Sequence, residues 1–188
     1  MNIRRAIPND FDAMVLVDQR AYGNDGASRA FFEAKFAAFP EGMLVVEESD
    51  RVIGFFVFEM RNGEDVGNDF TALNINTPLR GRWMHAIAFT PPTHYQKKEV
   101  DDLLLKAGEE IAKQFGCRAA CVPLPQEHPH APQVFQFWQS NGYKNVGTID
   151  WISPDGLKVA CDFYRKNFSS FLTRSTYNPH TKTGGTVL

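Results

Sequence analysis

A strand, a loop and a helix follow one another between Arg82 and Gly116, and this segment constrains the fold more than any other part of the chain. The strand expected over Arg82–Phe89 is apolar. The helix expected over Glu99–Phe115 has apolar residues on one face, charges on the other, and Gly116 as the C′ residue that ends it. A further apolar strand follows at Arg118–Val122, so the segment predicts a βαβ unit whose two strands are parallel.

The loop and the start of this helix give two opposing signals. A strand, a loop and a helix N-terminus in that order form an anion site from backbone N–H groups. The first helical turn nevertheless carries Glu99, Asp101 and Asp102. Acidic residues there stabilise the helix dipole, and each would repel a phosphate by roughly 3 kcal/mol at about 5 Å and an effective dielectric constant near 20. The sequence leaves both readings open: a cofactor's phosphates or the protein's own carboxylates occupy this place.

The remaining periodic segments complete one domain over residues 1–166, followed by a polar tail over residues 167–188. Arg61–Leu79 is polar and is expected to be a long loop. The other expected elements are a strand at Asn2–Ile7, a helix from Pro8–Asp10 to about Arg20, a helix at Ser28–Phe39, a hairpin of Met43–Glu48 and Arg51–Met60, a helix at Gln133–Ser140, and a hairpin of Asn145–Ile152 and Leu157–Tyr164.

Charge, apolar runs and cysteine content argue against several classes of function, although they do not exclude a local basic patch. A formal net charge of −2 gives the 188-residue chain no overall attraction to nucleic acid or to an anionic membrane. The longest apolar run, Val52–Phe58, is too short to span a bilayer. The three cysteines, Cys117, Cys121 and Cys161, cannot all pair, which favours buried thiols in a reducing cytoplasm. We therefore expect a cytoplasmic protein that binds neither nucleic acid nor membrane.

The order of these elements, together with three local motifs, resembles the GNAT superfamily of N-acetyltransferases. The motifs are IRRAIPNDFDAM at the start, GMLVVEESDRVIGFFVFEM with the usual Ile53-Gly54, and the opening segment followed by FWQSNGYKNVG. The resemblance covers about Asn2–Lys166. It implies a mixed α/β fold, in which a central, twisted, mostly antiparallel sheet contains one parallel βαβ pair and is flanked by helices.

The resemblance also implies acetyl-CoA as the cofactor. In the family, the main chain of the strand matching Ala88 and Phe89 holds the pantetheine arm, and the loop that follows wraps the pyrophosphate. Glu99 and Asp101 stand where the family has glycines, and Trp138 stands where it often has a proton-donating tyrosine. The residues that match the pyrophosphate loop are Gln96, Lys97, Lys98, Glu99, Val100 and Asp101.

Two histidines are candidates for acid–base catalysis. His85, in the middle of its strand, is either a structural histidine or the base that takes the acceptor's proton, and alternation places it with Trp83, Ile87 and Phe89. His130 lies with His128 and Glu127 in the loop before the helix at Gln133–Ser140. These three lack a further spaced ligand, so no metal site is expected. Glu59, at the end of its strand, faces either the acceptor site or solvent, of which solvent is favoured, and Tyr143 is expected to lie in the core.

Two functions remain from the sequence. The first is an acyl-CoA-dependent N-acyltransferase that transfers an acetyl group to a small-molecule or peptide amine. The second is a GNAT-fold protein without catalysis that binds a small ligand or a protein, which the substitutions at Glu99, Asp101 and Trp138 favour. An unpaired terminal hairpin and the tail could mediate a homodimer.

Overall fold

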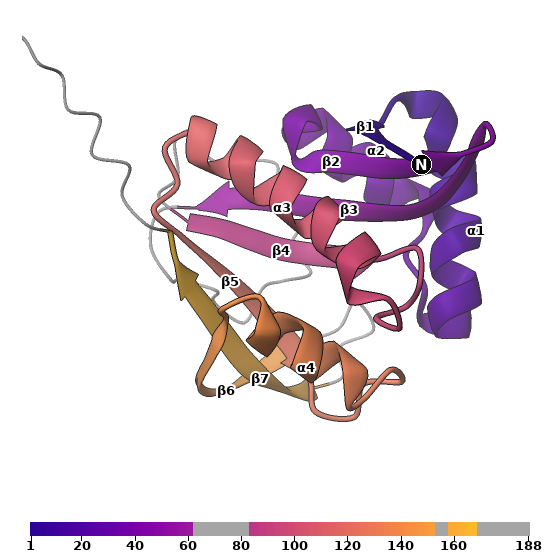
Figure 1. Cartoon of the computed structure of the whole chain (residues 1–188). Helices are drawn as coiled ribbons and strands as arrows, with labels where there is room; N and C mark the ends of the chain where they lie inside the picture. The colour runs from indigo at the N-terminus through magenta and orange to yellow at the C-terminus, as the bar shows by residue number, and fades with distance from the viewer. Residues whose placement is uncertain (62–82, 153–157, 169–188) are drawn as a thin grey trace, which may run out of the picture.

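The computed structural model of the chain describes residues 1–61, 83–152 and 158–168, which form one seven-stranded sheet with helices on both faces (Figure 1). The strands are β1 (Asn2–Arg5), β2 (Met43–Glu48), β3 (Arg51–Arg61), β4 (Trp83–Thr90), β5 (Ala119–Pro125), β6 (Lys144–Ile152) and β7 (Lys158–Asn167). The helices are α1 (Phe11–Tyr22), α2 (Arg29–Ala38), α3 (Lys98–Gln114) and α4 (Gln133–Ser140), with short 3-10 turns at Pro8–Asp10, Gly23–Asp25 and Pro40–Gly42.

The strand order in the sheet is β1-β2-β3-β4-β5-β7-β6. Neighbouring strands are antiparallel except β4 and β5, which are parallel and are connected through α3. The mixed, mostly antiparallel sheet with one βαβ pair confirms the fold class predicted from the sequence. The last strand in the sequence, β7, is inserted between β5 and β6, so β6 is the edge strand of the sheet.

The helices divide between the two faces of the sheet. Helices α3 and α4 pack with the larger hydrophobic cluster, which includes Leu104, Leu105 and Phe137, and α1 and α2 pack with a second cluster around Met14 and Phe32 (Figure 1). In α2, Phe32 belongs to this second cluster, and Phe31 and Phe36 pack against it. No helix in the described ranges is long and apolar enough to cross a membrane.

Local sequence explains two turns, the one between β2 and β3 and the one after α3. Ser49 and Asp50 both have positive φ values, 50° and 59°, which is the two-residue turn that suits a tight hairpin and confirms the one expected here. Gly116 has a φ of 87° and ends α3 as predicted. A Cβ on Gly54 would lie 2.8 Å from Cδ of Pro92, so this glycine allows the β4–α3 loop to cross directly over β3.

A β-bulge in β4 reverses the side-chain alternation within that strand. Val57 of β3 pairs with Ala88, whereas Phe58 pairs with Ala86, so Ile87 is the extra residue. Phe89 consequently packs with the α3 and α4 cluster, while Ile87 packs with the α1 and α2 cluster. The alternation argument that placed Phe89 on the same face as His85 is therefore wrong, because simple alternation assumes an unbroken register.

Glu59 is buried and paired, which corrects the expectation that it faces solvent. Its side chain is 3% exposed, and its carboxylate contacts Lys35 of α2 at 3.0 Å and Arg61 of the same strand at 2.6 Å. Lys35 itself is 7% exposed. Burial is the largest single influence on the pKa of Glu59 and raises it, but the attraction of Lys35 and Arg61 together outweighs burial, so the pKa is lowered. Glu59 is therefore an ionised carboxylate in the interior.

Several expectations fall partly or wholly outside the described residues. These are most of the long loop at Arg61–Leu79, the turn around Ser153–Gly156 and most of the tail after Asn167. The start of the tail is described: Phe168 is 9% exposed, and its amide donates to the carbonyl of Arg118 at 2.8 Å. The three cysteines are buried as expected, and no disulfide joins them in the part of the chain that the structure covers.

Candidate functional site

The sheet opens between β4 and β5. These two strands pair at only three positions, from Trp83 opposite Ala119 to His85 opposite Cys121, and then diverge (Figure 1). Beyond His85, the main chain of β4 pairs with β3 on one side but makes no ladder with β5 in the described structure. The bulge at Ile87 lies in this unpaired stretch, where it changes the direction of the neighbouring backbone groups. Ala88 and Phe89, two of the predicted cofactor-binding residues, directly follow it.

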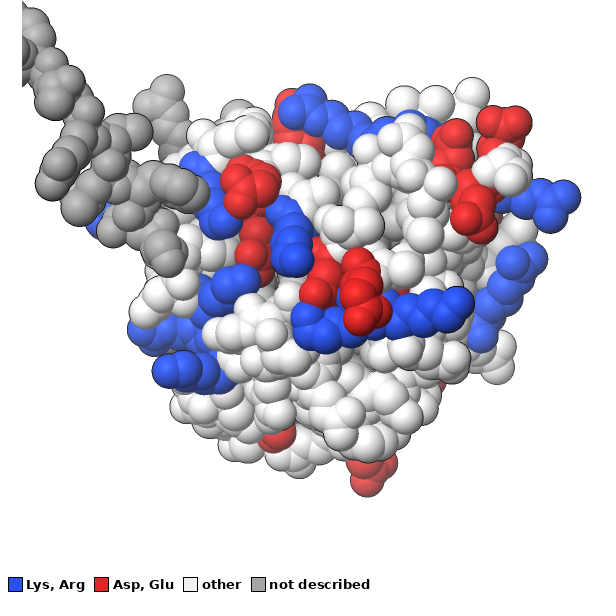
Figure 2. Space-filling model, in the orientation of Figure 1, with Lys and Arg blue, Asp and Glu red and all other residues white. Residues whose placement is uncertain are grey.

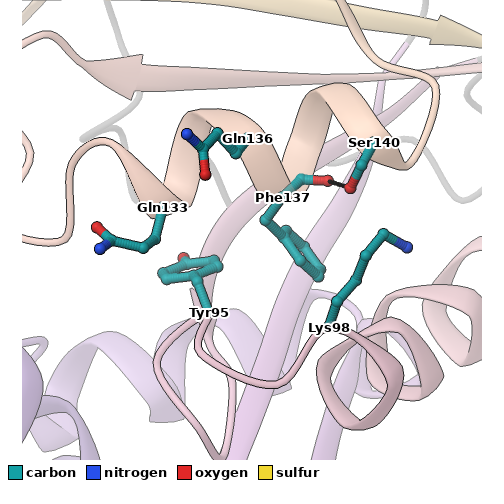
Figure 3. A pocket seen from close by; sticks show the side chains of 6 residues that line it. All are labelled: Tyr95, Lys98, Gln133, Gln136, Phe137 and Ser140. Carbon is teal, nitrogen blue, oxygen red and sulfur yellow. Dashed lines mark hydrogen bonds between the residues drawn. The ribbon is translucent and has the colours of Figure 1, made fainter.

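A cavity of about 230 Å³ lies between the start of α3 and helix α4 (Figure 3). Helix α4 contributes Gln133, Gln136, Phe137 and Ser140, while Tyr95 and Lys98 come from the β4–α3 loop and the first residue of α3. Lys98 is the single charged residue in this lining, and its ammonium group is paired with Asp102. The cavity is therefore lined mainly by neutral amide, hydroxyl and aromatic groups, and it is smaller than the roughly 300–1,000 Å³ of pockets for drug-sized ligands.

The loop from Pro91 to Lys97 turns Tyr95 into the protein. His94 and Tyr95 both have left-handed backbone conformations, with φ values of 49° and 68°, which are uncommon for residues other than glycine. The Tyr95 side chain is 8% exposed, packs against Phe89 and Phe137, and donates a hydrogen bond from its hydroxyl to the carbonyl of Phe89 at 3.0 Å. One of the main-chain groups expected to hold a pantetheine arm is therefore already bound by the protein itself.

Asp101 holds this loop in place. Its carboxylate is fully buried and accepts hydrogen bonds from the amide of Thr93 at 3.2 Å, the hydroxyl of Thr93 at 2.7 Å and the amide of Tyr95 at 2.9 Å. Burial raises the pKa of Asp101, and the bonds from Thr93 and Tyr95 oppose this effect. The acidic residue at the start of α3 thus caps the preceding loop, which is one of the two roles that the sequence left open.

Most amides of the segment that matches a pyrophosphate loop are also paired within the chain. The amide of Gln96 donates to the carbonyl of Thr93 at 3.1 Å, and that of Lys97 donates to the hydroxyl of Thr93 at 2.9 Å. The amides of Val100 and Asp101 donate to the carbonyl of Lys97 at 3.1 and 3.2 Å. The side chains of Gln96, Lys97, Lys98 and Glu99 are exposed on the outside of this turn.

A cluster of histidine and tyrosine rings lies beside Tyr95. His94 and His130 are stacked, with ring centroids 5.3 Å apart and planes at 15°, and His128 lies 5.7 Å from His130. Tyr22, from the end of α1, contacts both His128 and His130 edge-on at 5.7 and 5.5 Å. Within the described ranges, no group of three or more His, Cys, Asp or Glu side chains has the arrangement of a metal site.

Burial and mutual proximity favour the neutral form of two of these imidazoles. Desolvation, followed by the proximity of His130, lowers the pKa of His128 to about 4 and lowers that of His94 as well. Burial raises the pKa of Tyr22 to about 12. Nε2 of His130 and Nδ1 of His94 are buried and have no hydrogen-bond partner among the residues described. His130 therefore has a buried ring nitrogen whose hydrogen-bonding capacity is unused within the described part of the chain.

The cluster is connected to α1 through the end of β4. The hydroxyl of Thr90 donates to Asp18 at 2.6 Å, and the other oxygen of Asp18 accepts from the amide of Ala27 at 2.6 Å. Burial raises the pKa of Asp18. This network fixes the position of α1 relative to the point where β4 ends and the loop begins. The sequence analysis did not identify Tyr22, Tyr95 or Asp18, whose contacts come from separate elements and leave no local pattern.

The predicted site residues do not all come together. Phe89, His130 and the loop residues surround Tyr95 on the side of α3 and α4. His85 is fully buried in the sheet, in register with Glu59 of β3 and Cys121 of β5. Trp138 is 1% exposed and packs in the core against Phe89 and Tyr143, so its side chain has almost no surface to offer a cofactor. Tyr143 is buried as expected.

The surface around the cavity has no continuous patch of one charge. Figure 2 shows acidic and basic side chains side by side over α3, while the region over α4 is largely uncharged. The sequence of α4, QVFQFWQS, has no charged residue. The entrance therefore suits a neutral group better than a strongly anionic one.

Known structures share the fold of this chain. No protein-family model matches the sequence, and no curated protein matches it. The GNAT-like decarboxylase GphF, solved in complex with isobutyryl-CoA, superposes with a TM-score of 0.73 at 17% identity, covering 89% of this chain and 99% of that one. The loading GNATL domain of CurA from Lyngbya majuscula gives 0.70 at 14% identity, covering 88% and 96%. The chain has the GNAT fold.

A third neighbour extends the similarity to an acetyltransferase solved with its cofactor. The putative acetyltransferase yncA from Salmonella typhimurium, with acetyl-CoA, gives a TM-score of 0.63 at 16% identity and covers 93% of this chain and 98% of that one. At these identities the comparison establishes the GNAT fold alone, and it confirms the fold that the resemblance implied. Two of these GNAT-fold proteins are thus described with an acyl-CoA bound, and one of them is called a decarboxylase. The GNAT fold by itself does not determine the reaction.

The His128 imidazole predicts a pH dependence of stability. An unfolded histidine titrates near pH 6.5, whereas burial lowers the pKa of His128 in the folded protein to about 4. As the pH falls from about 6.5 to 4, the unfolded state binds a proton that the folded state does not, so the free energy of unfolding decreases. Glutamine does not titrate, so His128→Gln escapes this loss. When the pH is lowered from 7 to 4.5, the free energy of unfolding of His128→Gln should therefore rise by about 2 kcal/mol relative to that of the wild type.

Urea unfolding of both proteins across this pH range measures the effect. The glutamine side chain introduced by His128→Gln retains an acceptor for the amide of His130, which in the wild type donates to Nδ1 of His128 at 3.0 Å. A constant difference in stability between the two proteins from pH 7 to 4.5 would contradict the neutral, buried state of His128.

Proposed function

We propose that the protein is an acyl-CoA-dependent N-acyltransferase that transfers an acyl group, such as acetyl, to an amine of a small molecule or peptide. The observation that supports it best is the opening of the sheet after His85, which leaves the bulged segment Ala86–Thr90 of β4 without a neighbouring strand on the side of β5 in the described part of the chain. The cavity is lined by Tyr95 and Phe137, and both of these rings pack against Phe89 of this segment. Solved neighbours of the same fold with isobutyryl-CoA or acetyl-CoA are consistent with the proposal.

The residues present fit one half of an acyl-CoA better than the other. The side chains of Gln133 and Gln136 can accept or donate hydrogen bonds to the amides of a pantetheine arm, and so can the main chain around Ala88. The hydroxyl of Ser140 already donates to the carbonyl of Phe137 at 2.9 Å, so it contributes shape to the cavity wall. The loop from Gln96 to Asp101 fits a pyrophosphate poorly, because four of its amides are paired within the chain. Acetyl-CoA would supply the acyl group activated as a thioester.

The chain's own contribution is to orient the reactants and to accept a proton. Holding two reactants in the correct geometry accounts for a large share of the rate of such a transfer, and unpaired strand amides stabilise negative charge on a carbonyl oxygen. We assign the role of proton acceptor to His130, since Nε2 of this imidazole has no partner among the described residues. His85 remains the second candidate, and it would act from the α1 and α2 side. Trp138 cannot donate a proton at any accessible pKa.

Calorimetric titration with acetyl-CoA tests the proposal, and a variant pair localises the binding site. Ser140 lines the cavity and is exposed on α4. Ser140→Trp fills the cavity and is expected to weaken acetyl-CoA binding by at least about tenfold, a loss of about 1.4 kcal/mol. Ser140→Ala keeps the cavity open and is expected to bind as the wild type does.

Release of free thiol in the presence of amines measures the reaction itself. An increase that depends on both the amine and the wild-type protein is expected. In the calorimetric titration, acetyl-CoA at about 1 mM would reveal even a weak complex. Absence of heat at that concentration would refute the proposed acyltransferase activity.

A second function has an observation in its favour. The loop that a cofactor would use is bound by the protein's own Asp101 and Thr93, and Tyr95 binds the carbonyl of Phe89. A GNAT-fold protein that has lost catalysis and binds another ligand would show the same self-contained loop. Binding of acetyl-CoA without any amine-dependent thiol release would favour this alternative.

A further inference from the structure

The place of a nucleotide's phosphates at the start of α3 is taken by part of the chain. The Asp101 carboxylate accepts three hydrogen bonds from the β4–α3 loop and is fully buried. A carboxylate that accepts hydrogen bonds from two amides and a hydroxyl of the loop before a helix makes the same kind of interactions as a bound phosphate. The loop is therefore already folded around an anion, and this anion is covalently part of the protein.

Few hydrogen-bond donors near Asp101 remain free to bind a second anion. Of the six amides from Gln96 to Asp101, four donate to groups of Thr93 or Lys97. The ammonium group of Lys98 is paired with Asp102, and the exposed Glu99 adds a further negative charge to the same turn. A phosphate about 5 Å from an uncompensated carboxylate loses on the order of a hundredfold in affinity.

The cavity between the start of α3 and α4 is mainly neutral, in contrast to the acidic first turn of α3. Its walls are formed by two glutamine side chains, a serine, a tyrosine and a phenylalanine, with the paired Lys98 at the edge. Its volume of about 230 Å³ suits a narrow chain with amide groups rather than a nucleotide. The two halves of the site thus favour different parts of an acyl-CoA molecule.

We propose that the protein recognises its acyl donor through the pantetheine arm alone, with Asp101 in place of the diphosphate. The substrate class is then pantetheine thioesters, whatever group is attached at the phosphate end. This inference rests on the proposed function, since it concerns the same site. It assigns to Asp101 a role in donor selectivity in addition to its role in holding the loop.

Calorimetric titration of the wild-type protein with three ligands tests the inference directly. The ligands are pantetheine, which has no phosphate, 4′-phosphopantetheine and CoA. Dissociation constants within about threefold of one another are expected, because the phosphates add little binding. CoA binding that is more than about thirtyfold tighter than pantetheine binding would overturn the inference while leaving the proposed function intact. Absence of binding by all three, and by acetyl-CoA, would instead refute the proposed function.

Two charge-matched variants identify the residue responsible. Asp101→Asn keeps the shape and an oxygen acceptor for the loop but removes the charge, so CoA affinity should rise about tenfold while pantetheine affinity stays unchanged. Glu110→Gln removes the same charge from an exposed position near the other end of α3 and should change neither affinity. Equal CoA affinity in Asp101→Asn and wild type would contradict the role of Asp101. If the variant's loop does not fold, as a lowered melting temperature would reveal, the three-ligand series on the wild type still decides the question.

Discussion

Replacing Glu59 by alanine is expected to lower the free energy of unfolding by about 3–5 kcal/mol. The side chain is 3% exposed and holds Lys35 at 3.0 Å and Arg61 at 2.6 Å. Alanine leaves the ammonium group of Lys35 buried between α2 and the sheet without its counter-ion. A buried, uncompensated charge costs far more than the ion pair contributes, so the loss exceeds that of an ordinary surface pair.

Equilibrium unfolding in urea at pH 7 measures this loss, and Glu33→Ala provides a matched control. Glu33 lies on the same helix as Lys35 and pairs with Arg29, but both of these side chains are about half exposed. Its replacement should cost less than about 1 kcal/mol. Equal losses in the two variants would show that the pair between Lys35 and Glu59 is not desolvated in solution.

Trp138→Ala is expected to lower the free energy of unfolding by about 3–5 kcal/mol. The indole is 1% exposed and packs against Phe89, Phe137 and Tyr143, with ring centroids 4.8–5.7 Å apart. Its removal leaves a large cavity between α4 and β4. Urea unfolding at pH 7 measures the loss.

Trp138→Phe separates the packing of the ring from its N–H group. The indole Nε1 is buried and finds no acceptor in the described part of the chain, and an unpaired buried donor is itself unfavourable. Phenylalanine keeps an aromatic ring and removes this donor, so the loss should be only about 1–2 kcal/mol. A nearly unchanged stability of Trp138→Ala, accompanied by lost acetyl-CoA binding, would instead place Trp138 in the ligand site.

The elements that the sequence predicted well are those with local causes. The helix Gln133–Ser140 has the expected bounds, and the hairpin around Ser49 and Asp50 differs from the prediction only in the end of β3, at Arg61 instead of Met60. A two-residue turn and a 3.6-residue periodicity depend on neighbouring residues only. The parallel pairing of β4 and β5 follows from the handed connection through α3. Motif order was sufficient to predict the GNAT fold.

The features that the sequence missed depend on contacts between distant segments. The bulge at Ile87 results from the register of β4 against β3, and it changes the face on which Phe89 lies. Glu59 meets Lys35, which lies 24 residues earlier in the chain, only after α2 has packed on the sheet. A strand-end position considered alone predicts an exposed carboxylate.

The candidate site was predicted in part. The acidic residues at the start of α3 were recognised as the point on which cofactor binding depends, and the structure places Asp101 on the loop amides. Tyr95 was not identified, because its inward position requires left-handed conformations at both His94 and Tyr95. Such conformations are uncommon outside glycine and have no reliable signature in a single sequence.

The position of β7 has a consequence for the order in which the molecule assembles. Strand β5 meets β4 at three positions but meets β7 at seven, and β6 pairs only with β7 within the described sheet. During synthesis, the first four strands and their helices can form one unit before β7 emerges from the ribosome. The wall of the opening formed by β5 and α4 gains its main support only when residues 158–167 have been made. The larger hydrophobic cluster, which includes Tyr164 and Phe168, and the wall of the candidate site are therefore completed together, after the second cluster around α1 and α2.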